Sequence, residues 1–267
     1  MHYQYDIMKK RSLLIPSFAT LACLFSFLLP CSSLSITSAA STASNLKDYA
    51  GAASGLFNNM RTPAALIGGA VVPLGILSAP PLQENESKKV HLLKKANVLL
   101  AIASLLSEIL AITYSTVAIN KLAEVRFAPT SGVSELIAQN FELAWIGTNV
   151  HFLLGLFGFG LLVGSKAYFL YGPKVGKIAG SWSVAAFLQC SSIVNRGIAM
   201  GSRDTDGTGF QFAKNLFLLT LKYVGLVITK VKEGPLPMLA LSFVLYSFFL
   251  IYQLVLDTFK PMEEKVE

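Results

Sequence analysis

Charged residues are scarce in this chain of 267 residues: they make up 14% of the sequence, whereas hydrophobic residues make up 53%. Together with a mean hydropathy of +0.57, this composition excludes an ordinary water-soluble globular protein and indicates a membrane protein. The net charge of +7 comes from a cluster at residues 9–11 and from lysines and arginines scattered between apolar segments. We therefore expect the lipid bilayer to be a partner and expect no nucleic acid.

Cysteine, histidine and the sequence motifs of enzymes are scarce or absent too. Cys23 and Cys31 lie in a segment that we expect to be removed, so Cys190 has no partner for a disulfide. Of three histidines only His151 lies inside an apolar span, which excludes a two-histidine haem within one subunit and a tetrahedral zinc site. The chain contains no GxGxxG, Walker, HExxH or GxSxG motif, so we predict that it is not an enzyme.

Residues 1–40 have the pattern of a cleaved presequence. A basic cluster precedes an uncharged apolar core, and the small residues Ser38, Ala39 and Ala40 offer a cleavage site. The segment after the core is rich in Ser, Thr and Ala and lacks acidic residues, as in organelle transit peptides. The alternative is a first membrane anchor that stays attached. Residues 41–62 are predicted to be a polar linker.

The presequence together with the segment MRTPAALIGGAVVPLGIL (residues 60–77) resembles plastid-targeted membrane proteins of algae with secondary plastids, many of which have no assigned function. This resemblance implies a plastid membrane, either thylakoid or envelope. Ser41 stands where such presequences usually have an aromatic residue. Another endomembrane of the secretory pathway is therefore the alternative destination.

The mature chain contains apolar windows of about 20 residues, the length that crosses the hydrocarbon core as a helix. They predict an all-α, polytopic transmembrane helical bundle over residues 63–258 with four to six membrane helices, followed by an acidic tail at 259–267. Residues 63–79 are short and interrupted by Pro73, which predicts a kinked or half-inserted helix, and Lys222 makes a span over 215–229 costly. The better windows are 96–120, 143–165, 236–256 and, less apolar, 177–197.

Lysines cluster in two short loops, at residues 83–95 and 166–177. Because positively charged loops tend to stay on the side from which a protein inserts, we expect these two loops to share one face.

Three of the predicted helices carry polar stripes at helical spacing, and we expect these stripes to face the interior of the bundle. In 96–120 the stripe has Glu108 near mid-span, and an ionisable residue there must face protein or water. Its members are Asn97, Ala101, Ser104, Glu108 and Ser115. In 143–165, His151 shares a groove with glycines, while Asn149 lies on the opposite side near a Gly160/Gly164 pair. Both of these small-residue faces are expected to pack against neighbouring helices. In 177–197, a polar edge consists of Ser181, Ala185, Gln189, Ser192 and Arg196, and a small-residue edge consists of Ser183, Ala186, Cys190 and Gly197.

The four candidate site residues are Glu108, Asn149, His151 and Gln189. They could be interhelical hydrogen-bonding groups only, or Glu108 and His151 could form a centre that binds a ligand, a proton or a pigment. His151 could supply one axial ligand to a chlorophyll-type magnesium. We therefore predict a membrane scaffold or binding protein associated with other membrane subunits and with a pigment or apolar cofactor. The alternative is a small proton-linked transporter or channel that uses Glu108 and His151.

Glu108 and His151 are also predicted to lie at similar depths if their helices are antiparallel neighbours, because each residue rises about 1.5 Å. A hydrogen bond or ion pair between them would relieve the cost of burying either group.

If the presequence is cleaved, the mature protein begins between Ser38 and Asn45. Amino-terminal sequencing of the membrane-extracted protein checks this expectation. Recovery of Met1 or Tyr3 at the amino terminus would instead indicate a retained anchor.

Overall fold

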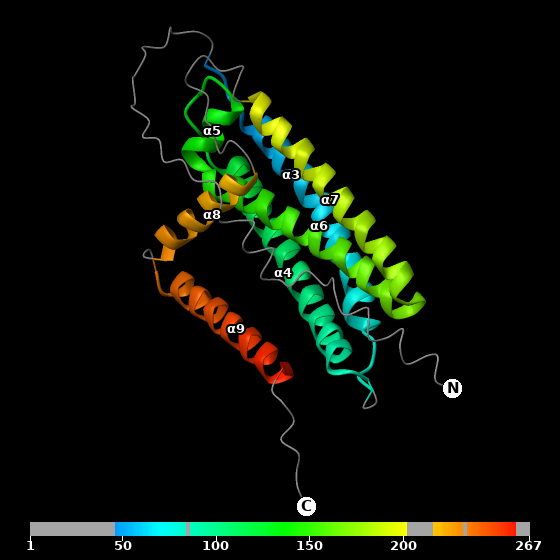
Figure 1. Ribbon diagram of the computed structural model, residues 1–267. Helices are drawn as coiled ribbons and strands as arrows, with labels where there is room; N and C mark the ends of the chain where they lie inside the picture. Colours follow the sequence, from blue (N-terminus) through cyan, green and yellow to red (C-terminus); the bar gives the residue numbers. More distant parts are fainter. Residues whose placement is uncertain (1–45, 84–85, 202–215, 232–233, 260–267) are drawn as a thin grey trace, which may run out of the picture. The chain divides into compact units, whose positions relative to one another are not determined.

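The computed structural model describes residues 46–83, 86–201, 216–231 and 234–259 (Figure 1). Over these ranges the chain is helical without a strand, which confirms the predicted all-α class. The predicted presequence (1–40) and all but the first residue of the acidic tail (259–267) lie outside the described residues. In chain order the elements are α3 (Ala50–Val71), the π-helix η1 (Val72–Leu77), α4 (Lys88–Glu124), α5 (Val133–Asn140), α6 (Glu142–Tyr171), α7 (Pro173–Gly201), α8 (Leu216–Val231) and α9 (Pro235–Phe259).

Helix α3 corrects the polar linker that the sequence predicts at 41–62, since the helix begins at Ala50. The polar residues Asn58 and Asn59 lie on its exposed side. Phe57 lies on the opposite side, fully buried, with its ring 5.5 Å from that of Trp145 on α6. An amphipathic first half therefore packs into the bundle although its composition resembles a linker.

Pro73 changes the helix without ending it. Proline lacks the N–H that continues an α-helical ladder, and here the backbone adopts π-helical hydrogen bonding over η1. Counted from Ala50 to Leu77, the continuous helical segment has 28 residues. The prediction of a short segment at 63–79 was wrong because the helix starts earlier than the apolar run.

Among the described residues, four helices are long and apolar enough to cross a membrane. This number lies within the predicted four to six. Three of the four, α4, α6 and α9, contain the windows 96–120, 143–165 and 236–256, and the fourth runs from Ala50 to Leu77. Helix α7, which contains the window 177–197, is 29 residues long but is not among the four, and α8 has only 16 residues.

Helices α3, α4 and α6 pack together through residues without large side chains. A Cβ atom added at Gly75 would lie 2.4 Å from the Cβ of Ala101 on α4 and 3.2 Å from a methyl of Leu162 on α6. Further along, the Gly158 position on α6 would meet Ser104 on α4 at 2.8 Å, so α4 and α6 run antiparallel. Close backbone approach of this kind stabilises helix packing in lipid, where apolar burial gives little drive.

The predicted second smooth face of α6 contacts α7. A Cβ atom at Gly164 would lie 2.9 Å from the backbone of Gly180, and one at Gly160 would lie 3.4 Å from Ser183. Helix α6 is therefore packed on both of its small-residue faces, as its sequence predicts.

The two lysine loops lie at the same end of the bundle, as predicted. Lys166, at the end of α6, donates a hydrogen bond to the carbonyl oxygen of Ser78, and Ser165 donates one to Asn97 near the start of α4. At the opposite end, α5 contributes Leu136 and Ile137 to an apolar cluster with Phe57 and Phe141.

Gly75→Ala should lower the free energy of unfolding by about 1–3 kcal/mol, because the new methyl collides with Ala101 and nothing flexible can move aside. Gly69→Ala is the matched control: it lies in α3, and a Cβ atom there would have no atom within 4 Å. The control should be neutral or stabilising by up to about 1 kcal/mol, since alanine favours helix. Thermal or denaturant unfolding in detergent measures both. Equal losses would contradict the packing described for η1.

Candidate functional site

Glu108 lies where three helices meet. It is 0% exposed. Gly68 of α3 approaches from one side, where an added Cβ would be 3.4 Å from the Cβ of Glu108. Gly155 of α6 lies on the other side, where an added Cβ would be only 2.2 Å from Oε1. The carboxyl group therefore occupies space that any larger residue at Gly155 would fill.

Neither carboxyl oxygen of Glu108 has a hydrogen-bond partner within the part of the chain that the structure describes. A buried neutral polar group without a partner costs about 1–3 kcal/mol, and an ionised carboxylate costs more. The carboxyl group is therefore a destabilising element of an otherwise closely packed junction.

The rest of the predicted α4 stripe is buried as expected, and its hydroxyl groups have partners. Ser104 Oγ donates to the carbonyl oxygen of Gly155 at 2.7 Å, and Ser115 Oγ donates to that of Ala111 at 2.8 Å. Asn97 accepts a hydrogen bond from Ser165, although its Nδ2 lacks a partner in the described chain. The five stripe residues, all at most 3% exposed, are Asn97, Ala101, Ser104, Glu108 and Ser115.

His151 belongs to a separate aromatic group that joins α4, α6 and α8. Its Nε2 lies 2.6 Å from the hydroxyl oxygen of Tyr223, and its ring stacks on Tyr114 with the centroids 6.1 Å apart. The two tyrosine hydroxyl groups are 3.4 Å from one another. A single imidazole thus ties α8 to the α4–α6 pair.

The predicted pair between Glu108 and His151 is not formed. Nε2 of His151 bonds Tyr223, and both oxygens of Glu108 are without a partner among the residues described. Glu108 packs instead against Gly155, which follows His151 by one helical turn. Similar depth was the basis of the prediction, but the two side chains extend toward different neighbouring helices.

The other two candidates do not join either group. Asn149 is half-buried and donates from Nδ2 to the carbonyl oxygen of Trp145 in its own helix, at 2.8 Å. Gln189 is exposed, which corrects the expectation that its polar edge faces inward. Because the small-residue edge of α7 at Gly180 and Ser183 packs on α6, the polar edge is directed away from it.

Sequence reasoning missed Gly68, Tyr114 and Tyr223. The best available signal was Gly147, one turn before His151, because a Cβ atom at Gly147 would lie 2.8 Å from the ring of Tyr114. A glycine at that spacing leaves room for a large neighbour but does not say which residue fills it.

The sequence predicts that His151 could supply one axial ligand to a chlorophyll-type magnesium ion. In its hydrogen-bonded position His151 offers neither nitrogen to a magnesium ion, since Nε2 contacts Tyr223 and Nδ1 is buried. Within the described residues no group of three or more His, Cys, Asp or Glu side chains could hold a metal ion.

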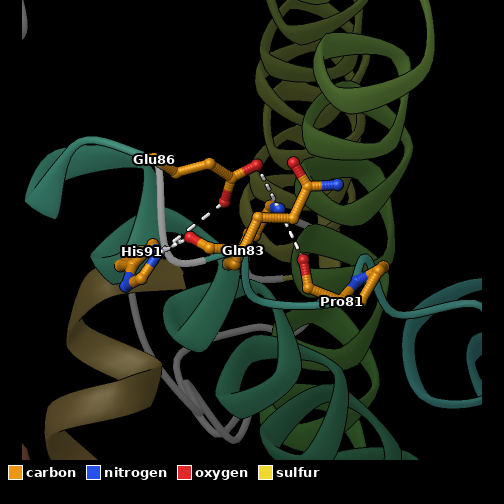
Figure 2. Close-up of polar contacts among 5 residues, drawn as sticks. Pro81, Gln83, Glu86 and His91 are labelled. Carbon is orange, nitrogen blue, oxygen red and sulfur yellow. Dashed lines mark hydrogen bonds and ion pairs between the residues drawn. The ribbon is translucent and has the colours of Figure 1, made fainter.

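A second polar cluster lies at the lysine end of the bundle, outside the apolar spans. Lys94 Nζ donates to Glu86 Oε1 and to the carbonyl oxygen of Pro81, both at 2.6 Å. Figure 2 shows Glu86 and His91 beside Pro81 and Gln83, with His91 Nε2 2.6 Å from the carbonyl oxygen of Gln83. The hydrogen bond from Lys94 is the main reason that the pKa of Glu86 lies below its ordinary value. These contacts tie the loop after η1 to the start of α4.

Comparisons of the chain with protein-family models, with curated proteins and with solved structures find no match.

Glu108→Met should raise the free energy of unfolding by about 1–2 kcal/mol, because a side chain of similar length replaces the unpartnered carboxyl group. Leu106→Met, at an exposed position of the same helix, is the control and should change stability by less than about 0.5 kcal/mol. Denaturant unfolding in detergent provides the measurement. A loss of stability in Glu108→Met would mean that the carboxyl group has a stabilising partner.

The effects of Glu108→Met and His151→Leu should add to within about 0.5 kcal/mol, since the two groups do not bond. His151→Leu and Tyr223→Phe, by contrast, should be coupled because each removes the same hydrogen bond. A double-mutant cycle for each pair separates these expectations. Strong coupling between Glu108 and His151 would restore the pair predicted from the sequence.

The contribution of Glu86 to stability should depend on pH. A carboxyl group whose pKa is lowered on folding stabilises the protein above its unfolded pKa, and this contribution is lost as the pH falls through the folded pKa. Wild type should therefore exceed Glu86→Gln in thermal midpoint at pH 7, and the difference should vanish as the pH falls well below the ordinary carboxyl pKa of about 4.3. A difference that persists unchanged at pH 3 would contradict this.

Proposed function

We propose that this chain is an integral membrane scaffold that binds other membrane subunits and has no catalytic role of its own. The observation that supports this most directly is the closed junction at Glu108, where an ionisable group is 0% exposed and packed between Gly68 and Gly155. A closed, glycine-packed core positions helices firmly. Within the described residues, Glu108 has no exposed surface that a substrate could contact.

A hollow at the surface is consistent with this proposal. It measures about 350 Å³ and opens at the lysine end between the start of α4 and the end of α9. Its lining includes Lys94, Leu99 and Leu254 but not Glu108 or His151. The candidate ionisable groups therefore do not line this opening.

A proton-linked transporter or channel is the second candidate, and the unpartnered oxygens of Glu108 near mid-span favour it. Such a function requires a water-filled path from Glu108 to one side of the membrane. The burial of Glu108 and the separate bonding of His151 to Tyr223 both weigh against that path.

Two further parts of the proposal rest on the sequence. The presequence pattern supports a plastid membrane, thylakoid or envelope, with another secretory endomembrane as the alternative. A pigment or other apolar cofactor would bind on an outer face of the bundle or between subunits, because a pigment held at His151 would have to displace Tyr223.

Purification of the full chain from its native membrane in a mild detergent tests the proposal. Native mass spectrometry and an absorption spectrum of the same sample should detect additional membrane subunits in fixed ratio, with or without a pigment. A chain that carries neither protein subunits nor pigment after gentle extraction would overturn the scaffold function. Proton uptake into vesicles that depends on Glu108 would establish the second candidate instead.

A further inference from the structure

Helix α9 borders α4 without being enclosed by other helices. It is long and apolar enough to cross a membrane, yet none of its described residues from Pro235 to Thr258 is buried. In a bilayer, lipid chains therefore contact most of the surface of α9. The hollow between the end of α9 and the start of α4 lies beside this lipid-exposed surface.

The lining of this hollow combines carbon surface with positive charge. We call it the α4–α9 hollow, and its lining includes Lys94, Lys95, Val98, Leu99 and Leu254. Its volume of about 350 Å³ falls within the range of roughly 300–1,000 Å³ that ligand sites have. A lining of this kind suits a ligand that has both a hydrocarbon chain and a negative charge.

Lys95 is the positive charge in the hollow that is available to a ligand. The ammonium group of Lys94 is already engaged, because it donates to Glu86 Oε1 and to the carbonyl oxygen of Pro81, both at 2.6 Å. Lys95 is exposed and forms no ion pair with any residue that the structure describes. Asp257, an exposed acidic residue one turn after Leu254, does not line the hollow.

The charged and apolar parts of the hollow lie at the depths of the two parts of a lipid molecule. Lys95 directly precedes the apolar window 96–120, which is long enough to cross the hydrocarbon core. A lysine at this position extends its ammonium group to the level of the lipid headgroups. Leu99 lies one turn further along, about 6 Å deeper, because each residue rises about 1.5 Å. A phosphate group at Lys95 would therefore have its acyl chains at the level of Leu99.

We propose that the α4–α9 hollow binds one anionic phospholipid, with the phosphate group at Lys95 and an acyl chain between Leu99 and Leu254. A free phosphate ion would contact Lys95 but leave the apolar surface uncovered. A zwitterionic lipid would cover that surface but carry no net negative charge. Basic pockets between membrane helices bind anionic headgroups for this combined reason. The site needs no other subunit, so it does not depend on the scaffold function.

Lipid titration of the purified, delipidated full chain in mild detergent tests the proposal. Native mass spectrometry counts the lipids retained when phosphatidylglycerol or phosphatidylcholine with the same acyl chains is added. We expect one phosphatidylglycerol to be retained with about fivefold or higher affinity than phosphatidylcholine, the factor expected for one lysine–headgroup contact. Phosphatidylglycerol should also raise the thermal midpoint, whereas inorganic phosphate should leave it unchanged.

Lys95→Gln should lower the affinity for phosphatidylglycerol about fivefold and leave that for phosphatidylcholine unchanged. Lys89→Gln is the matched control, since it removes the same charge from an exposed position at the same end of α4. Lys89 does not line the hollow and is turned by about 120° around the helix from Lys95. The control should change the affinity less than about twofold, because solvent and salt screen charges that do not touch the ligand.

Leu99→Trp should fill part of the hollow and lower the retention of phosphatidylglycerol at least about fivefold, since the acyl chain loses its apolar contact. Leu170→Trp, at an exposed position of α6 at the same end of the bundle, is the control and should have no effect. Both leucines are exposed, so neither replacement disturbs the core. An unchanged thermal midpoint of each variant without lipid verifies that it is folded.

Equal affinity for the two lipids, or equal losses in Lys95→Gln and Lys89→Gln, would overturn the headgroup contact. Full binding by Leu99→Trp would overturn the position of the acyl chain. In native membranes, the photoreactive variant Leu99→benzoylphenylalanine should crosslink to phospholipid, and a protein crosslink instead would show that a polypeptide occupies the hollow.

The scaffold function and the lipid site can fail separately. If phosphatidylglycerol is retained with the expected variant effects while no other subunit or pigment co-purifies, the scaffold function fails and the lipid site stands. If subunits co-purify but the chain does not distinguish the two lipids, the lipid site fails and the scaffold function stands.

Discussion

Close approach of helix backbones through glycine is the interaction on which the rest of this structure depends. At the junction of α3, α4 and α6, Gly68 and Gly155 admit the side chain of Glu108, and Gly75 meets Ala101 directly. In lipid, apolar side chains gain little by leaving hydrocarbon, so dispersion contacts between closely packed helices must supply the stability. A larger residue at these positions would force the helices apart.

The same packing separates the polar groups of the core into two sets. Among the described residues Glu108 has no hydrogen-bond partner, whereas His151, one turn from Gly155 on α6, bonds to Tyr223 of α8. Helix α8 is itself fastened near the start of α6, where Lys222 forms an ion pair with Glu142. Lys222 makes α8 a poor membrane span. Its ion pair with Glu142 holds α8 at the end of the bundle, where a charge is less costly.

Polar groups on the outer surface of the bundle differ from those in the core in their contacts. His151 is hydrogen-bonded within the chain, whereas Gln189 is exposed on α7. A small-residue edge and a polar edge on one helix can each serve as an interface, and α6 occupies only the first of them. The organisation of α7 thus packs one edge within the chain and leaves the other edge exposed.

The sequence by itself determined the elements whose signal is local. Apolar windows of spanning length predicted α4, α6 and α9, and helical spacing predicted the buried stripe from Asn97 to Ser115. The two small-residue faces of α6 were predicted as well. Each of these follows from composition and from the 3.6-residue period, which depend on no distant part of the chain.

Only the tertiary structure decided which faces meet. The start of α3 at Ala50 depends on the burial of Phe57 against α6, which no local pattern in residues 41–62 reveals. Glu108 and His151 share a level, but the direction of each side chain is set by the helix that packs beside it. The spacing of residues along a helix fixes their depth and their angle about the axis of that helix. The partner of a polar group depends instead on how whole helices are rotated against one another. That rotation is determined by packing over the entire length of the helices.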